Sequence, residues 1–104
     1  MSFAVTAYFN ETRGQRFEGY CPGEQPELVP SQLEALPMAH DTPEEAAEEV
    51  FAFLNHDYRP NGRTERSLSV GDLLRMERHD GVVFWLAVEG RGFRQVDGPV
   101  FTTA

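Results

Sequence analysis

The sequence predicts one α+β domain, with a mostly antiparallel sheet of four to six strands and one main helix packed on one face. Three observations lead to this prediction. The chain has 104 residues, enough for a single core. Residues 43–54 carry apolar side chains at helical spacing. Residues 68–103 alternate short apolar runs with Gly- and Asp-containing turns, which is typical of an antiparallel meander.

The N-terminal part contains one clear strand. Residues 3–9 (FAVTAYF) are rich in β-branched and aromatic side chains, and residues 16–20 are a candidate hairpin partner. Residues 21–30 hold three prolines and a glycine, so we expect an irregular loop there. A short helical turn is expected after Ser31, ending at Pro37.

The main helix is predicted to begin after Thr42, which forms a capping box with Glu45 and precedes Pro43. The Thr42 oxygen is expected to accept a hydrogen bond from the Glu45 backbone N–H, with the Glu45 side chain reaching back. We expect Asn55 to be a left-handed C-terminal cap. One apolar stripe should face the sheet, formed by Ala46, Ala47, Val50, Phe51 and Leu54.

The C-terminal half is predicted to supply most of the sheet. Its expected strands are residues 68–70, 73–77, 82–88, 93–96 and 100–103. Turns at Asp80-Gly81, Gly90–Gly92 and Asp97–Pro99 separate the last four. The run 82–88 is apolar enough for the centre of the sheet, and its neighbours Phe84 and Trp85 should face opposite sides.

Residues 55–72 form the best candidate binding surface, because a polar loop of this length in a small domain exceeds what a simple connection needs. The candidate binding residues are Asn55, Asp57, Tyr58, Arg59, Arg63, Arg66 and Asp72. The planar guanidinium of arginine can donate paired hydrogen bonds to a phosphate or carboxylate, and the tyrosine ring can stack on a nucleic-acid base. The alternative is that Arg59 and Arg66 pin the loop to backbone carbonyls and nearby carboxylates. Those carboxylates belong to Asp57, Glu65 and Asp72.

The end of this loop is expected to be structural rather than catalytic. Gly71 supplies a backbone conformation that other residues avoid, and Asp72 should accept hydrogen bonds from the amides of the turn. A nucleophilic serine needs a base, and no histidine is placed to serve one here. His40, His56 and His79 are scattered without the spacing of a metal site. We therefore predict no catalytic residue, no metal and no cofactor.

Charge is divided unevenly along the chain. Residues 1–58 hold eleven acidic residues and two arginines, whereas residues 59–104 hold six acidic residues and seven arginines. The overall charge of −8 argues against broad nucleic-acid binding. Four exposed helix carboxylates, Glu44, Glu45, Glu48 and Glu49, offer an acidic face to a basic protein partner. The alternative is a solvated helix face that only confers solubility.

Composition also indicates location and source. The longest apolar runs fall far short of the ~20 residues that span a bilayer. The N-terminus lacks the basic lead and apolar stretch of a signal peptide, so we expect a cytoplasmic protein. The single Cys21 excludes an internal disulfide. All basic residues are arginine, which indicates GC-rich DNA such as that of actinobacteria and their phages.

Several short motifs occur from the helix onward: Val50-Phe51, Asn55, Asp57-Tyr58-Arg59-Pro60, the string RSLSVGD at 66–72, and Gly92-Phe93. In these motifs, over about half its length, the chain resembles the YodL-like domain family. The resemblance implies a small domain of plasmid, phage and conjugative-element proteins, with anti-defence or regulatory work.

These observations together predict a non-enzymatic protein-interaction module of a mobile genetic element or its host, such as an anti-defence or accessory factor. The alternative is a local nucleic-acid or nucleotide binder that uses the arginine-rich 55–72 loop. A hydrolase is the least favoured class, since no pair of nucleophile and base emerges.

Overall fold

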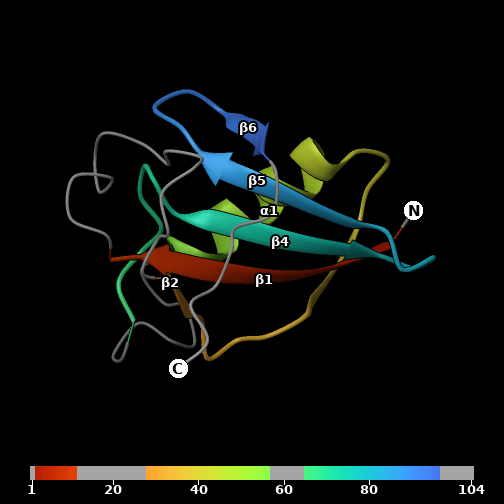
Figure 1. Cartoon of the computed structure of the whole chain (residues 1–104), viewed down its shortest axis with the longest axis horizontal. Coiled ribbons are helices and arrows are strands. Elements are labelled where there is room, and N and C mark those ends of the chain that lie inside the picture. Colours follow the sequence, from red (N-terminus) through yellow and green to blue (C-terminus); the bar gives the residue numbers. More distant parts are fainter. Residues whose placement is uncertain (1, 12–27, 57–64, 97–104) are drawn as a thin grey trace.

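The computed structural model describes residues 2–11, 28–56 and 65–96, which form a sheet and one helix (Figure 1). The predicted α+β architecture is confirmed. In chain order the elements are β1 (Ser2–Asn10), β2 (Leu28–Pro30), β3 (Leu36–Ala39), α1 (Pro43–Leu54), β4 (Leu73–Arg78), β5 (Val83–Val88) and β6 (Phe93–Val96).

The sheet has six strands, and every paired neighbour is antiparallel. Its main path runs β2-β1-β4-β5-β6, so the first strand lies beside the C-terminal meander. The third strand also pairs with β1, on the edge that β2 occupies. Residues 8–10 of β1 pair with β2, and residues 2–5 pair with β3. Two short strands therefore share one edge of β1.

The helix forms for the reasons that its sequence indicates. Thr42 is the N-cap, and its Oγ1 accepts a hydrogen bond from the Glu45 backbone N–H at 3.2 Å. The Glu45 carboxylate reaches back to the Thr42 hydroxyl, which donates to it at 3.2 Å. The predicted stripe is confirmed: four of its side chains are buried, and Phe51 is half-buried at the margin.

The helix ends differently from the prediction. Asn55 has φ −106° and ψ 1°, so the left-handed cap is wrong. Its backbone N–H still closes a helical hydrogen bond to Phe51 O at 3.0 Å. Its side chain binds both backbone polar groups of Leu68, at 2.7 and 3.3 Å. Asn55 therefore ends the helix between the helical and extended regions of backbone space, with its side chain bound to Leu68 and without a left-handed conformation.

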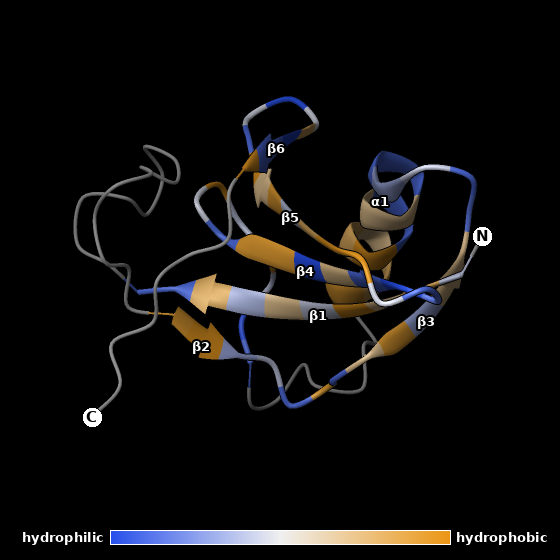
Figure 2. Cartoon of the chain, turned by 45° about the vertical axis from the view of Figure 1, so that its right-hand side comes forward, coloured by the Kyte–Doolittle hydropathy of each residue, from blue (hydrophilic) through white to orange (hydrophobic). Residues whose placement is uncertain are grey.

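The main core lies between α1 and one face of the sheet (Figures 1 and 2). Inward side chains alternate along the strands, as a pleated sheet requires. They include Phe3, Val5, Ala7 and Phe9 from β1, Leu74 and Met76 from β4, and Leu86 from β5. A smaller cluster on the opposite face contains Leu73 and Ala87, with Tyr8, Leu28, Trp85 and Val96 around them.

The two adjacent aromatic residues of β5 face opposite sides, as predicted. Phe84 packs on the helix side and contacts the Phe3 ring edge-on, with the ring centroids 6.3 Å apart. Trp85 lies on the other side, and its ring centroid is 5.3 Å from that of Tyr8. Aromatic pairs therefore pack on both faces of the sheet.

The path of residues 28–38 corrects the prediction of a loop and a helical turn. Two strands form there because the edge of β1 has backbone groups to pair. Between them the chain turns at Ala35, whose φ is 51°. The Ala35 N–H donates to Thr6 Oγ1 at 2.9 Å, and the Ser31 N–H donates to Ala7 O at 2.8 Å. Pro30 and Pro37 fit because an edge strand need not donate every N–H.

The predicted strands at 73–77, 82–88 and 93–96 are confirmed as β4, β5 and β6, with small shifts at their ends. The sequence predicts the run 82–88 at the centre of the sheet, but β4 occupies the centre and β5 lies between β4 and the edge strand β6, because β1 pairs with β4. No strand forms at residues 68–70, because this segment pairs with side chains instead of a neighbouring strand. The proposed strands at 16–20 and 100–103, and Cys21, lie outside the described residues. Over the described ranges, no helix is long and apolar enough to cross a membrane.

Candidate functional site

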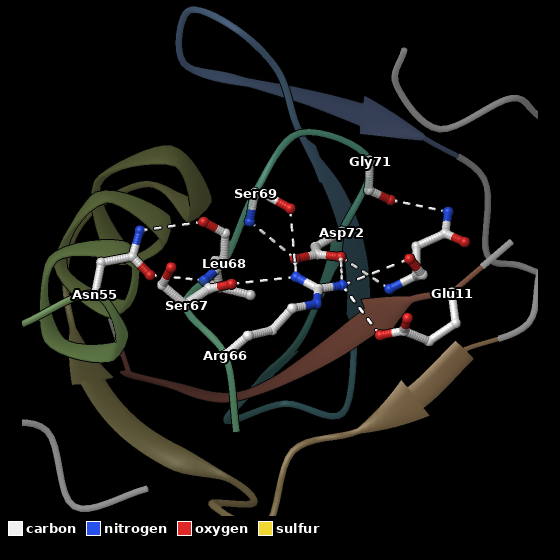
Figure 3. Close-up of polar contacts among 9 residues, drawn as sticks. Glu11, Asn55, Arg66, Ser67, Leu68, Ser69, Gly71 and Asp72 are labelled. Atoms are coloured by element: carbon white, nitrogen blue, oxygen red, sulfur yellow. Dashed lines mark hydrogen bonds and ion pairs between the residues drawn. The ribbon is translucent and has the colours of Figure 1, made fainter. Parts of the chain in front are cut away.

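A buried carboxylate, that of Asp72, lies at the end of the predicted 55–72 surface (Figure 3). Its side chain is 1% exposed. The Arg66 guanidinium donates to both carboxylate oxygens, at 2.7 and 2.9 Å. The backbone N–H of Asn10 donates to Oδ1 at 2.8 Å, and that of Ser69 donates to Oδ2 at 2.9 Å. Each oxygen of this carboxylate therefore accepts two hydrogen bonds within the protein.

The guanidinium of Arg66 makes further contacts around Asp72 (Figure 3). It donates to Ser67 O at 3.1 Å and to Glu11 Oε1 at 3.3 Å. Its central carbon lies 4.9 Å from the centroid of the Phe9 ring, a cation–π distance. The pKa of Arg66 is raised, chiefly by its hydrogen bond to Asp72. The side chain is 25% exposed. Its two terminal nitrogens donate to groups of this same chain, whereas its buried Nε has no hydrogen-bond partner among the described residues.

The glycine of the same turn has the conformation that the sequence predicted. Gly71 has φ 97°, a region that residues with a side chain rarely adopt. Its N–H donates to Val88 O at 3.0 Å, and the Val88 N–H donates to Asp72 O at 2.9 Å. Its carbonyl accepts from Asn10 Nδ2 at 3.0 Å. The turn therefore joins the end of β1, the start of β4 and the end of β5.

The segment before this turn has a separate anchor at Glu65. Its carboxylate accepts a hydrogen bond from Ser31 Oγ at 2.7 Å and from the Gln32 N–H at 3.0 Å. The Asn55 side chain, which binds the backbone N–H and carbonyl of Leu68, is a second anchor. The described ends of the loop are thus fixed to α1, to β1 and to the turn between β2 and β3.

These contacts place three of the seven candidate binding residues. Asn55, Arg66 and Asp72 lie in one hydrogen-bonded region and bind groups of the same chain. Their contacts support the interpretation that Arg66 pins the loop. The other four candidates, Asp57, Tyr58, Arg59 and Arg63, lie outside the described residues. A ligand-binding role for the loop therefore stays a prediction.

The four helix glutamates are all exposed, but they have different surroundings. Glu45 and Glu49 lie beside His40, whose ring nitrogens are 3.9 and 3.1 Å from their carboxylates. Within the described ranges, Glu44 and Glu48 form no ion pair. They are four positions apart and so lie on one side of the helix.

An apolar groove of about 260 Å³ opens beside Glu48, between α1 and the turn that joins β5 to β6. Two half-buried rings, Phe51 and Phe93, meet in it edge-to-face with centroids 6.0 Å apart. The lining residues are Glu48, Phe51, Val88, Glu89, Gly90, Gly92 and Phe93.

Sequence reasoning missed this groove. The two rings are far apart in the chain, and the segment Gly90–Gly92 indicated only a turn. The available signal was Phe51 at the margin of the apolar stripe, next to the acidic side chains.

In the part of the chain that the structure describes, no group of three His, Cys, Asp or Glu side chains is arranged to hold a metal ion. No protein-family model, curated protein or solved structure matches this chain. The resemblance to the YodL-like domain family therefore stays a prediction from the motifs. Among the described residues, the exposed carboxylates of α1 adjoin this groove at Glu48.

Proposed function

We propose that this chain is a non-enzymatic protein-interaction module that binds a basic partner protein through the exposed carboxylates of α1. The observation that carries this proposal is the pair Glu44 and Glu48, exposed and without an ion pair in the described ranges. Like charges four residues apart on a helix repel each other by about 0.2–0.5 kcal/mol. A basic partner would remove this repulsion.

The position of the helix carboxylates also supports the proposal. A protein interface needs an apolar centre as well as a polar rim. The groove lined by Phe51 and Phe93 lies next to Glu48, so apolar and acidic surface adjoin. Complementary charge would speed association and select against acidic competitors.

The alternative function, nucleic-acid or nucleotide binding, counted Arg66 among its binding residues. The Arg66 guanidinium instead binds the Asp72 carboxylate of the same chain. The alternative function would depend on Tyr58, Arg59 and Arg63. The proposal of an anti-defence or accessory role in a mobile element or its host rests on the YodL-like motifs alone.

The experiment is affinity capture from host lysate with identification by quantitative mass spectrometry. The test variant carries Glu44→Lys and Glu48→Lys. The matched control carries Glu34→Lys and Glu77→Lys, which change the net charge equally at two exposed positions outside α1, of which Glu77 pairs with Arg75. We expect wild type and control to capture the same basic protein and the test variant to lose it. Equal capture by both variants would refute the proposal.

Two further assays address the other classes. Electrophoretic mobility shifts with single- and double-stranded DNA and RNA at low salt test nucleic-acid binding. A shift that Arg59→Ala with Arg63→Ala abolishes would favour the alternative function. Turnover of generic ester or phosphate substrates would refute the non-enzymatic assignment.

A further inference from the structure

We infer that the groove between α1 and the turn joining β5 to β6 receives an arginine side chain of the partner. This inference rests on the proposed function and specifies the contact at its centre. The occupant is a single guanidinium-bearing side chain from a basic segment.

The shape of the groove favours one side chain. Its volume of about 260 Å³ lies below the range of roughly 300–1,000 Å³ typical of small-molecule sites. Two of its lining residues, Gly90 and Gly92, have no side chain. A Cβ atom at either position would find no heavy atom within 4 Å, so this wall is open to an approaching chain.

The chemistry of the groove suits arginine better than other side chains. The rings of Phe51 and Phe93 give an apolar surface on which an arginine stem can lie and a guanidinium can stack. The Glu48 carboxylate can pair with the planar fork. The second carboxylate, Glu89, is already 2.8 Å from Arg94 Nε. Glu48 is thus the lining carboxylate that remains for an external cation.

Within the described residues, two arginines of this chain already use this combination of ring and carboxylate. Arg66 lies over Phe9 and binds Asp72. Arg78 lies 5.5 Å from the centroid of Phe84 and binds the Asp80 carboxylate at 2.7 and 2.9 Å. The groove repeats the combination, and no arginine of the described residues lines it.

The experiment is an NMR titration of the full-length ¹⁵N-labelled chain with the blocked tripeptide acetyl-Gly-Arg-Gly-amide. The lysine and citrulline versions of the tripeptide are the comparison probes. We expect chemical-shift changes centred on the amides of Phe51, Gly90 and Gly92. Affinity should fall from arginine to lysine to the uncharged citrulline. Changes spread over all surface carboxylates, or equal binding of citrulline, would overturn the inference.

Two variants test the lining residues. Glu48→Gln should weaken binding of the arginine peptide about 1.5- to fivefold, as expected for an exposed charge pair, and Glu34→Gln should leave it unchanged. Phe93→Leu keeps an apolar side chain but removes the ring face, and it should also weaken binding. Unchanged affinity in both Glu48→Gln and Phe93→Leu would refute the arginine site.

The proposed function and this inference can fail separately. If Phe93→Leu captures the partner as wild type does while Glu44→Lys with Glu48→Lys loses it, the acidic face binds the partner and the groove does not. If the tripeptide binds the groove but lysate yields no basic protein, the arginine site stands and the proposed function fails.

Discussion

Asp72 shows how a single residue can fix a loop. Placing a carboxylate at a position that is 1% exposed costs several kcal/mol unless its charge and its hydrogen bonds are satisfied. Arg66 supplies the charge, and two backbone N–H groups supply the remaining bonds. Removing the carboxylate would delete these four hydrogen bonds and the ion pair with Arg66.

We therefore expect Asp72→Ala to lower the free energy of unfolding by about 3 kcal/mol. Urea unfolding at pH 7, followed by circular dichroism, measures this loss. Asp80→Ala is the control, because Asp80 also pairs with an arginine through two hydrogen bonds but lies at the surface. Asp80→Ala should lower the free energy of unfolding by only a small part of the loss in Asp72→Ala. Similar losses in the two variants would contradict the role given to burial.

The surface pair predicts a pH effect. The hydrogen bond from Arg78 lowers the pKa of Asp80 from 3.8 to about 2. A lowered folded-state pKa means that ionised Asp80 adds stability above the unfolded value near 3.8, and that this contribution disappears as the pH falls through about 2. NMR titration of the Asp80 carboxyl carbon should give a midpoint near 2 in the wild type. In Arg78→Gln the midpoint should rise toward 3.8, and an unchanged midpoint would exclude Arg78 as the cause.

Among the elements, α1 begins where the local sequence requires. The Thr42 oxygen satisfies one of the N–H groups that an N-terminus leaves open. We expect Thr42→Ala to cost about 1 kcal/mol of stability and Thr42→Asp to restore most of it. Thermal and urea unfolding measure both changes. Asp41→Ala, at the exposed neighbouring position, is the control and should have little effect. A full loss in Thr42→Asp would contradict the capping role.

The turn between β2 and β3 places Ala35 at φ 51°, a region that disfavours residues with a side chain. We expect Ala35→Gly to raise the free energy of unfolding by about 0.5–1 kcal/mol and Ala35→Val to lower it. Chemical unfolding of the wild type, Ala35→Gly and Ala35→Val ranks their free energies of unfolding. If Gly and Val shift stability in the same direction, the backbone strain assigned to this turn is absent.

The elements differ in how far the sequence predicted them. The helix and the strands β1, β4, β5 and β6 followed from local periodicity, capping and turn residues. The strands β2 and β3 did not, because both contain proline and neither has an alternating pattern. They form because the edge of β1 offers unpaired backbone groups, which local sequence does not reveal.

For the whole molecule, the core between helix and sheet should dominate stability. Leu86 lies in the interior strand β5, between β4 and β6, is fully buried and faces α1. We expect Leu86→Ala to lower the free energy of unfolding by about 3 kcal/mol through lost contacts and a cavity. Val83→Ala, on the same strand but 38% exposed, should cost roughly 0.5 kcal/mol. Urea unfolding measures the free energy of unfolding of both variants. Equal losses would contradict the assignment of Leu86 to the main core.

The candidate sites depended on contacts between distant parts of the chain. Sequence reasoning named Asp72 as one of three acidic partners for Arg66, but it could not include Asn10 or Glu11. Both lie more than fifty positions away and approach through the pairing of β1 with β4. The groove beside Glu48 also depends on a contact between distant residues, because its two rings, Phe51 and Phe93, come from α1 and β6.

The sequence by itself determined the fold class, the acidic helix and its N-cap, the three meander strands and the glycine of the loop turn, because each depends on neighbouring residues. The tertiary structure decided that β1 has two partners on one edge, that Arg66 lies against β1 and Asp72, and that Phe51 and Phe93 share a groove. Those outcomes depend on strand pairing and on burial of charge between segments far apart in the chain. Local residue patterns do not specify such contacts.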